Sequence, residues 1–258
     1  MKILIIGDVV GNCGTEFLRH NLMTIAKQHN ADMIIANGEN AAKNNGLDEA
    51  TAKELFMSGV DVITSGNHIW HKFEMQNIID NYENIIRPAN YPSECPGNGY
   101  VIFNAMGVRV LVINVLGTVY LDSYSCPFET IERILRREEG CYDISIVDIH
   151  AEATSEKAAI ARYFDGRLTA VVGTHTHVQT ADERLLKKGT AFITDLGMTG
   201  AYESILGVDE ERVIKKFLTK MPTRFEQAEG ECQFNAVVLE VDNVSYKAKG
   251  IERIFIVK

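Results

Sequence analysis

Short apolar runs, each followed at once by a glycine-rich or polar turn, recur along the chain and constrain its fold more than any other feature. Six of them are rich in β-branched residues, and they cover 2–8, 32–40, 61–68, 108–117, 143–150 and 168–177. Runs of this length and composition are typical of buried strands.

Helical stretches separate several of these runs. Residues 14–29 carry apolar side chains at the 3.6-residue spacing of an amphipathic helix. Residues 48–59 begin with Asp48 as a candidate N-cap and end at a glycine, and residues 154–166 also end at a glycine. Alternating strands and helices predict an α/β fold with a parallel sheet that is covered on both faces.

Two later segments are typical of antiparallel hairpins. Residues 99–115 contain two runs joined by a Met-Gly turn, and residues 232–258 contain two runs with a turn near Asp242. They predict a mixed sheet and allow two sheets packed together. Because no repeat or low-complexity linker interrupts the pattern, we expect residues 1–258 to form one domain.

The composition excludes several classes of protein. With 26 basic and 35 acidic residues the net charge is −9, which argues against a surface that grips nucleic acid by its phosphates. No stretch approaches the 18 apolar residues of a membrane span, and the N-terminus lacks a signal-peptide pattern. The five cysteines are dispersed without a CxxC pair, so we expect reduced thiols and a cytoplasmic protein.

Polar side chains end five of the predicted strands. They are Asp8, Glu39 with Asn40, Asn67 with His68, His150, and His175 with His177. The carboxyl ends of strands in an open α/β sheet are where ligands bind, and these residue types are ligands for transition metals. They outnumber the four ligands of one zinc ion, so two metals bridged by a carboxylate account for them better. If the backbone stays extended, His175 and His177 share a face.

Each of these residues alone has a simpler explanation. Asp8 or Glu39 could cap a helix, and Asn67 could occupy a left-handed turn. Capping cannot explain three imidazoles at the ends of two later strands, so the joint placement favours a metal centre. Cys13, the candidate for a thiol nucleophile, lacks a histidine–acid partner pattern.

Together, these residues resemble the conserved blocks of the calcineurin-like metallophosphoesterases. The shared blocks are "GD" at 7–8, "GEN" at 38–40, "GNH" at 66–68, the histidine at 150 and "GTHTH" at 173–177. The likeness is closer to the YmdB branch, bacterial phosphodiesterases similar to those that act on 2′,3′-cyclic nucleotides. It extends to "ENAA" at 39–42, "GNHIW" at 66–70, "RPANYP" at 87–92 and "TDLGMTG" at 194–200.

The resemblance implies a four-layer α/β/β/α sandwich with mixed sheets and a role for each residue. The first metal would be held by Asp8, Glu39, Asn40 and His177. The second would be held by Glu39, Asn67, His150 and His175, with Glu39 bridging the two. His68 would donate a proton to the leaving oxygen of a small phosphodiester, most simply a 2′,3′-cyclic nucleotide.

The sequence departs from the broad superfamily at the first two blocks. Val10 stands where an Asp-x-His block has histidine, so Asn40 would supply an amide oxygen instead, and the bridging residue is Glu39 where relatives usually have Asp. More oxygen ligands favour iron or manganese over zinc, with iron first. Ile69 replaces an acid that orients the histidine in many relatives, which leaves open what orients His68.

Two other functions are compatible with these patterns. Ile69 and the Lys43-Asn44 pair favour a metal-containing regulatory scaffold that binds a nucleotide or protein partner with little turnover. A zinc amidohydrolase also has a His-x-His block, but places it early in the chain, whereas here it follows residue 170. The sequence leaves a homo-oligomer, the natural substrate and the native metal open.

Overall fold

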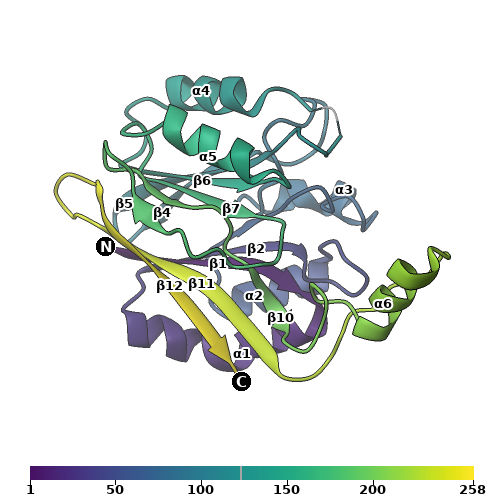
Figure 1. Ribbon diagram of the computed structural model, residues 1–258. Coiled ribbons are helices and arrows are strands. Elements are labelled where there is room, and N and C mark those ends of the chain that lie inside the picture. The colour runs from purple at the N-terminus through teal and green to yellow at the C-terminus, as the bar shows by residue number, and fades with distance from the viewer. Residues whose placement is uncertain (123) are drawn as a thin grey trace.

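The computed structural model describes residues 1–122 and 124–258, which form two six-stranded sheets packed face to face with helices outside them (Figure 1). The helices are α1 (Gly11–His29), α2 (Glu49–Met57), α3 (Met75–Ile78), α4 (Pro127–Arg137), α5 (Thr154–Tyr163), α6 (Glu210–Thr219) and the 3₁₀ turn η1 (Ile79–Asn81). Among these described helices, none is both long and apolar enough to cross a bilayer.

Both sheets are mixed, as the hairpin patterns predict. The first has the order β12-β11-β10-β1-β2-β3, and the second has the order β4-β5-β6-β7-β9-β8. The strands of the first are β1 (Lys2–Val10), β2 (Met33–Asn40), β3 (Val62–Thr64), β10 (Met198–Ala201), β11 (Cys232–Val241) and β12 (Ala248–Val257). Those of the second are β4 (Tyr100–Ala105), β5 (Val108–Leu116), β6 (Ile144–His150), β7 (Ala170–Thr174), β8 (Arg184–Leu185) and β9 (Ala191–Ile193). Parallel pairing joins β1, β2 and β3 in one sheet and β5, β6, β7 and β9 in the other.

The alternation of side chains along β1 shows how the four layers form. Ile3 and Ile5 belong to the apolar cluster between the two sheets, whereas Leu4 and Ile6 belong to the cluster beneath α1 and α2. A third cluster packs the second sheet against α4 and α5. Since strand residues alternate between faces, each sheet buries both of its sides. The predicted α/β/β/α sandwich is therefore confirmed.

Several predicted boundaries are correct and others move. Asp48 caps α2 as expected, because its carboxylate accepts a hydrogen bond from Thr51 N at 2.9 Å. Helix α1 begins at Gly11, three residues before the predicted start, where a φ of +59° lets the chain turn straight from β1 into the helix. The strands predicted over 61–68 and 168–177 end earlier, at residues 64 and 174. The residues beyond these ends leave the ladder and carry the candidate ligands.

Candidate metal centre

The carboxyl ends of β1, β2, β6 and β7 meet at one edge of the two sheets. A cavity of about 310 Å³ opens there, and Glu39, His68, His175 and His177 line it. Asp8 and His150, at or near the ends of β1 and β6, are completely buried. The structure therefore gathers at one edge the residues that the sequence places at five strand ends.

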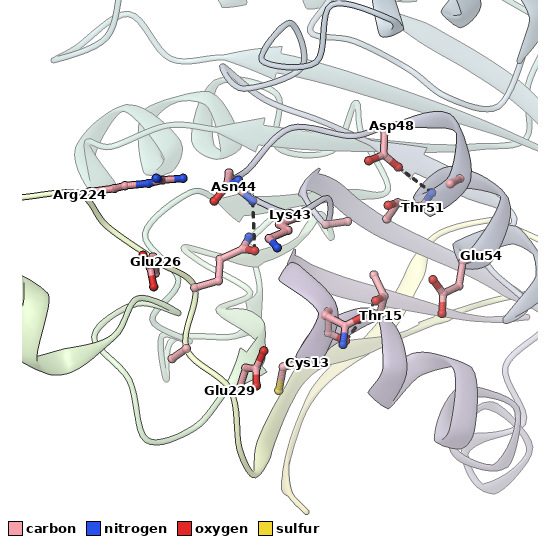
Figure 2. Close-up of a pocket in the computed structure, with 15 residues that line it drawn as sticks. Cys13, Thr15, Lys43, Asn44, Asp48, Thr51, Glu54, Arg224, Glu226 and Glu229 are labelled. Atoms are coloured by element: carbon pink, nitrogen blue, oxygen red, sulfur yellow. Dashed lines mark hydrogen bonds between the residues drawn. The ribbon is translucent and has the colours of Figure 1, made fainter.

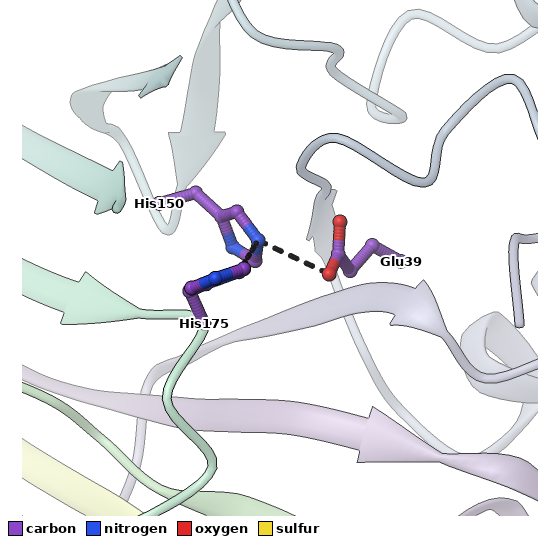
Figure 3. A group of neighbouring side chains, drawn as sticks. All are labelled: Glu39, His150 and His175. Carbon is purple, nitrogen blue, oxygen red and sulfur yellow. Dashed lines mark hydrogen bonds and ion pairs between the residues drawn. The ribbon is translucent and has the colours of Figure 1, made fainter. Parts of the chain in front are cut away.

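Glu39, His150 and His175 form the tightest group, and their donor atoms lie within 4.8 Å of one another (Figure 3). His150 Nε2 lies 3.1 Å from Glu39 Oε1 and 3.0 Å from His175 Nδ1. Asn67 Oδ1 lies 3.2 Å from the same His150 nitrogen. These four residues are the set predicted to hold the second metal.

The set predicted for the first metal shares Glu39 with the second set. Asn40 Nδ2 lies 3.0 Å from Glu39 Oε1 and 3.2 Å from His177 Nε2, and His177 Nε2 lies 3.8 Å from Asp8 Oδ1. A half-turn of the Asn40 amide group about its last side-chain bond exchanges its oxygen and nitrogen. The Asn40 oxygen can therefore occupy the position between Glu39 and His177 equally well. Glu39 thus contacts both sets, as a bridging carboxylate must.

The expectation that His175 and His177 lie on an extended strand is wrong. Strand β7 ends at Thr174, and both histidines adopt left-handed backbone conformations, with φ of 103° and 63°. His175 turns toward His150, while His177 turns toward Asp8 and Asn40. The loop therefore delivers one imidazole to each set of ligands.

Asp8 tests whether a cation fits this site. Its Oδ2 accepts a hydrogen bond from His175 N at 3.0 Å, but its buried Oδ1 has no hydrogen-bond partner within residues 1–122 and 124–258. Burial raises the pKa of this carboxyl to about 6, despite the nearby imidazoles of His177 and His150. Buried carboxylate oxygens are normally paired, so an unpaired one among nitrogen and oxygen donors fits a metal ligand.

The charges of the other buried groups are strongly perturbed. Burial alone would raise the pKa of Glu39, but His150 and His68 outweigh burial and hold it well below its usual range. Burial alone would lower the pKa of His150, but Glu39, Asp8 and Asp148 raise it to about 9. Burial and the neighbouring His150 together lower the pKa of His175 to about 3. A protonated His150 therefore offsets the carboxylates in the metal-free protein.

Residues outside the predicted set fix the orientation of two imidazoles. The Thr174 hydroxyl donates to Asp148 Oδ1 at 2.7 Å and lies 2.9 Å from His150 Nδ1. Because that hydroxyl has one proton, it accepts from His150 Nδ1–H, and His150 Nε2 faces the site. Glu152 Oε2 lies 3.0 Å from His175 Nε2, which leaves His175 Nδ1 toward the site.

Sequence reasoning missed these supporting residues, although a signal for two of them exists. Asp148 precedes His150 by two positions and so shares its face of β6, and Glu152 follows it by two. Nothing local points to Thr174, because its role depends on β6 lying beside β7.

Asn40 is the partner of His68 that the sequence left open. His68 Nδ1 lies 2.7 Å from Asn40 Oδ1, and His68 N donates to Glu39 Oε2 at 3.0 Å. Burial lowers the pKa of His68, while Glu39 opposes that shift. Ile69 is buried in the core beneath α1 and α2, so it supplies packing instead of orientation. His71 stacks on the His68 ring with centroids 4.3 Å apart.

A wider cavity of about 670 Å³ lies beside the loop that follows β2 (Figure 2). Cys13, Lys43 and Arg224 line it, and none of the predicted ligands does. Gln227 lines both cavities, and its Nε2 donates to Ala42 O at 3.2 Å. The candidate ligands therefore lie at the smaller cavity, where the groups with perturbed pKa values converge.

Comparisons with known proteins agree with this geometry. The family model described as YmdB-like protein matches residues 4–254. The chain is 46% identical to the 2′,3′-cyclic-nucleotide 2′-phosphodiesterase of Bacillus subtilis over 99% of its own length and 97% of that protein. A structure of a hypothetical protein from Thermus thermophilus superposes over all of both chains with a TM-score of 0.94 at 40% identity. A structure described as a novel phosphatase from Mycoplasma pneumoniae covers all of this chain and 93% of that one, with a TM-score of 0.94 at 35% identity.

Proposed function

This chain belongs to the YmdB-like protein family, and from that premise we propose that it hydrolyses small phosphodiesters at a dinuclear metal centre, with 2′,3′-cyclic nucleotides as its substrates. The family and the relative named as a 2′,3′-cyclic-nucleotide 2′-phosphodiesterase support hydrolysis of phosphoric diesters. The cavity of about 310 Å³ at the site is in the range of small-ligand pockets.

The contacts of Glu39 carry the proposal. The Oε1 atom of this buried carboxylate lies 3.1 Å from His150 Nε2 in one ligand set and 3.0 Å from Asn40 Nδ2 in the other. A structural ion pair would require one such partner. A carboxylate between two ligand sets, beside the unpaired Oδ1 of Asp8, is instead the arrangement that two neighbouring cations need.

The residues assigned to each metal follow from that arrangement. Asp8, Glu39, Asn40 and His177 would hold one ion, and Glu39, Asn67, His150 and His175 would hold the other. When bound, the pair would lower the pKa of water to supply the nucleophile and would neutralise charge on the phosphoryl oxygens. With four oxygen donors besides three imidazoles, we propose iron first and manganese or zinc after it.

His68 is the proposed proton donor, and Asn40 sets which of its nitrogens carries the proton. With the Asn40 oxygen turned toward Glu39 and His177, its Nδ2 faces His68 Nδ1 and donates to it. The proton of a neutral His68 ring then resides on Nε2, where it can pass to the leaving oxygen. Passing that proton on leaves a neutral ring only if His68 starts as the imidazolium, a form that burial opposes and Glu39 favours.

Hydrolysis of two esters tests the proposal. Chelator-treated protein should fail to hydrolyse 2′,3′-cyclic AMP and bis(p-nitrophenyl) phosphate, and added Mn²⁺ should restore both activities. Turnover of the artificial ester alone would retain the chemistry and reject the cyclic nucleotide. Protein that holds two metals and hydrolyses neither ester would favour the regulatory scaffold.

Two alanine variants separate the roles of His68 and Glu39. His68→Ala should keep its metal content and lose about 10²–10⁴-fold in rate, because only proton transfer is removed. Glu39→Ala should lose both metal and turnover. Metal analysis of the purified variants distinguishes them, and loss of metal from His68→Ala would refute its assignment as the acid.

A further inference from the structure

Lys157 is a fully buried lysine on the inner side of α5 that the proposed mechanism does not use. Its ammonium donates to Asp195 Oδ2 and to Thr174 O, each at 2.7 Å. Its aliphatic stem passes Gly173, where a Cβ would lie 2.8 Å from Lys157 Cδ. A lysine is seldom buried completely without a specific partner, so the groups that its ammonium contacts are informative.

Asp195 is equally buried and lies in the turn between β9 and β10, at the start of the "TDLGMTG" block. Besides Lys157, its carboxylate accepts from Thr176 N at 3.1 Å and from Gly197 N at 2.9 Å. Gly197 O in turn accepts from Asp8 N at 3.0 Å. The turn therefore contacts both the Asp8 strand and the histidine loop, which come from opposite sheets.

Lys157 and Asp195 contact the backbone on both sides of His175. Lys157 binds the carbonyl of the residue before it, and Asp195 binds the N–H of the residue after it. His175 and His177 both have left-handed φ values, which non-glycine residues keep only where the surroundings impose them. Within the part of the chain that the structure describes, Lys157 and Asp195 are the charged side chains that bind the backbone directly before and after His175.

We infer that the Lys157–Asp195 pair is a positioning device, which holds the loop 174–177 in the conformation that sends His175 and His177 to different metals. The inference rests on the proposed function, because it takes both histidines as metal ligands. Neither residue touches the reacting atoms. Their effect is to set the backbone from which the two imidazoles project, in the way that outer residues of metal sites orient the ligands.

A double-mutant cycle separates positioning from stability. Lys157→Met or Asp195→Asn alone leaves one buried charge without its partner and should lower the urea midpoint of the chelator-treated protein. The double variant has neither charge, so its urea midpoint should recover most of that loss. Ile160→Ala is the matched control, since Ile160 is a fully buried residue of the same helix that packs in the outer core of the second sheet.

The second measurement is Mn²⁺ binding to metal-free protein, followed by the paramagnetic resonance signal of free Mn²⁺. We expect the dissociation constant to rise about 10–100-fold in both single variants and to stay raised in the double variant. Ile160→Ala should lose stability and keep its Mn²⁺ affinity. Recovery of Mn²⁺ affinity in the double variant, or an equal loss in Ile160→Ala, would overturn the positioning role. Wild-type protein that binds no Mn²⁺ would instead overturn the metal centre and this inference with it.

Discussion

Replacing Thr174 by valine removes one hydroxyl from the contact between β6 and β7 and keeps nearly the same shape. In the native protein that hydroxyl donates to Asp148 at 2.7 Å and accepts from His150 at 2.9 Å. All three side chains are buried, so water does not replace the lost partners. Asp148 keeps hydrogen bonds from Thr64 and Asn37, whereas His150 Nδ1–H is left unpaired.

The expected loss of stability follows from these two contacts. A hydrogen bond to a charged group contributes about 1.5–3 kcal/mol, so losing both gives about 3–6 kcal/mol. That is a large share of the total stability of a typical protein, which is about 5–15 kcal/mol. Thr174→Ser keeps the hydroxyl and loses one methyl group, which costs about 1 kcal/mol.

Urea denaturation of the chelator-treated variants measures the difference. Thr174→Val should be less stable than Thr174→Ser by about 2–5 kcal/mol. It should also bind Mn²⁺ about 10–100-fold more weakly, because the His150 ring is no longer held with Nε2 toward the site. Equal stabilities for the two variants would show that the hydroxyl does not orient His150.

Three further predictions follow from the same site. Asp8→Asn should stabilise the metal-free protein by about 3 kcal/mol at pH 8, because a carboxyl whose folded pKa is raised from 3.8 to about 6 destabilises the fold as the pH rises between these values. This gain should disappear below the unfolded pKa of about 4. Urea titrations at pH 8 and below pH 4 measure it, and a gain that persisted at the lower pH would contradict this reasoning. Glu152→Gln should weaken Mn²⁺ binding about tenfold, because Glu152 contacts His175 Nε2 and no other candidate ligand among the described residues. The melting temperature should stay unchanged, because Glu152 is exposed. Saturating the wild-type protein with Mn²⁺ at 100 times its dissociation constant should stabilise it by about 2.7 kcal/mol per site, and calorimetry that showed no upward shift would contradict the fit of a cation at Asp8.

Local features of the sequence predicted much of the fold correctly. The turn at Met106-Gly107 joins β4 and β5 as expected, and Asp48 caps α2. Helix α4 was missed even though Pro127 at its start and apolar residues at 131, 134 and 135 were a readable signal. Strands of two to four residues, such as β8 and β10, carry too little periodicity to be recognised.

The identities of the candidate ligands were also readable, because carboxyl ends of parallel strands gather at one edge whatever the strand order. Their local conformation was not. Period-two reasoning kept His175 and His177 on one face, and the structure separates them.

By itself, the sequence determined where the longer strands lie and which donor types follow them, since both depend on neighbours a few positions away. Only the tertiary structure decided which way each imidazole points. The partners that orient His150 and His175 come from another strand, another helix and the turn after β9, and their contacts exist only when the sheets are packed. Asp8 Oδ2 on His175 N joins residues 167 positions apart. Contacts between residues so far apart form only when folding closes the long loop between them, so no local sequence pattern predicts them.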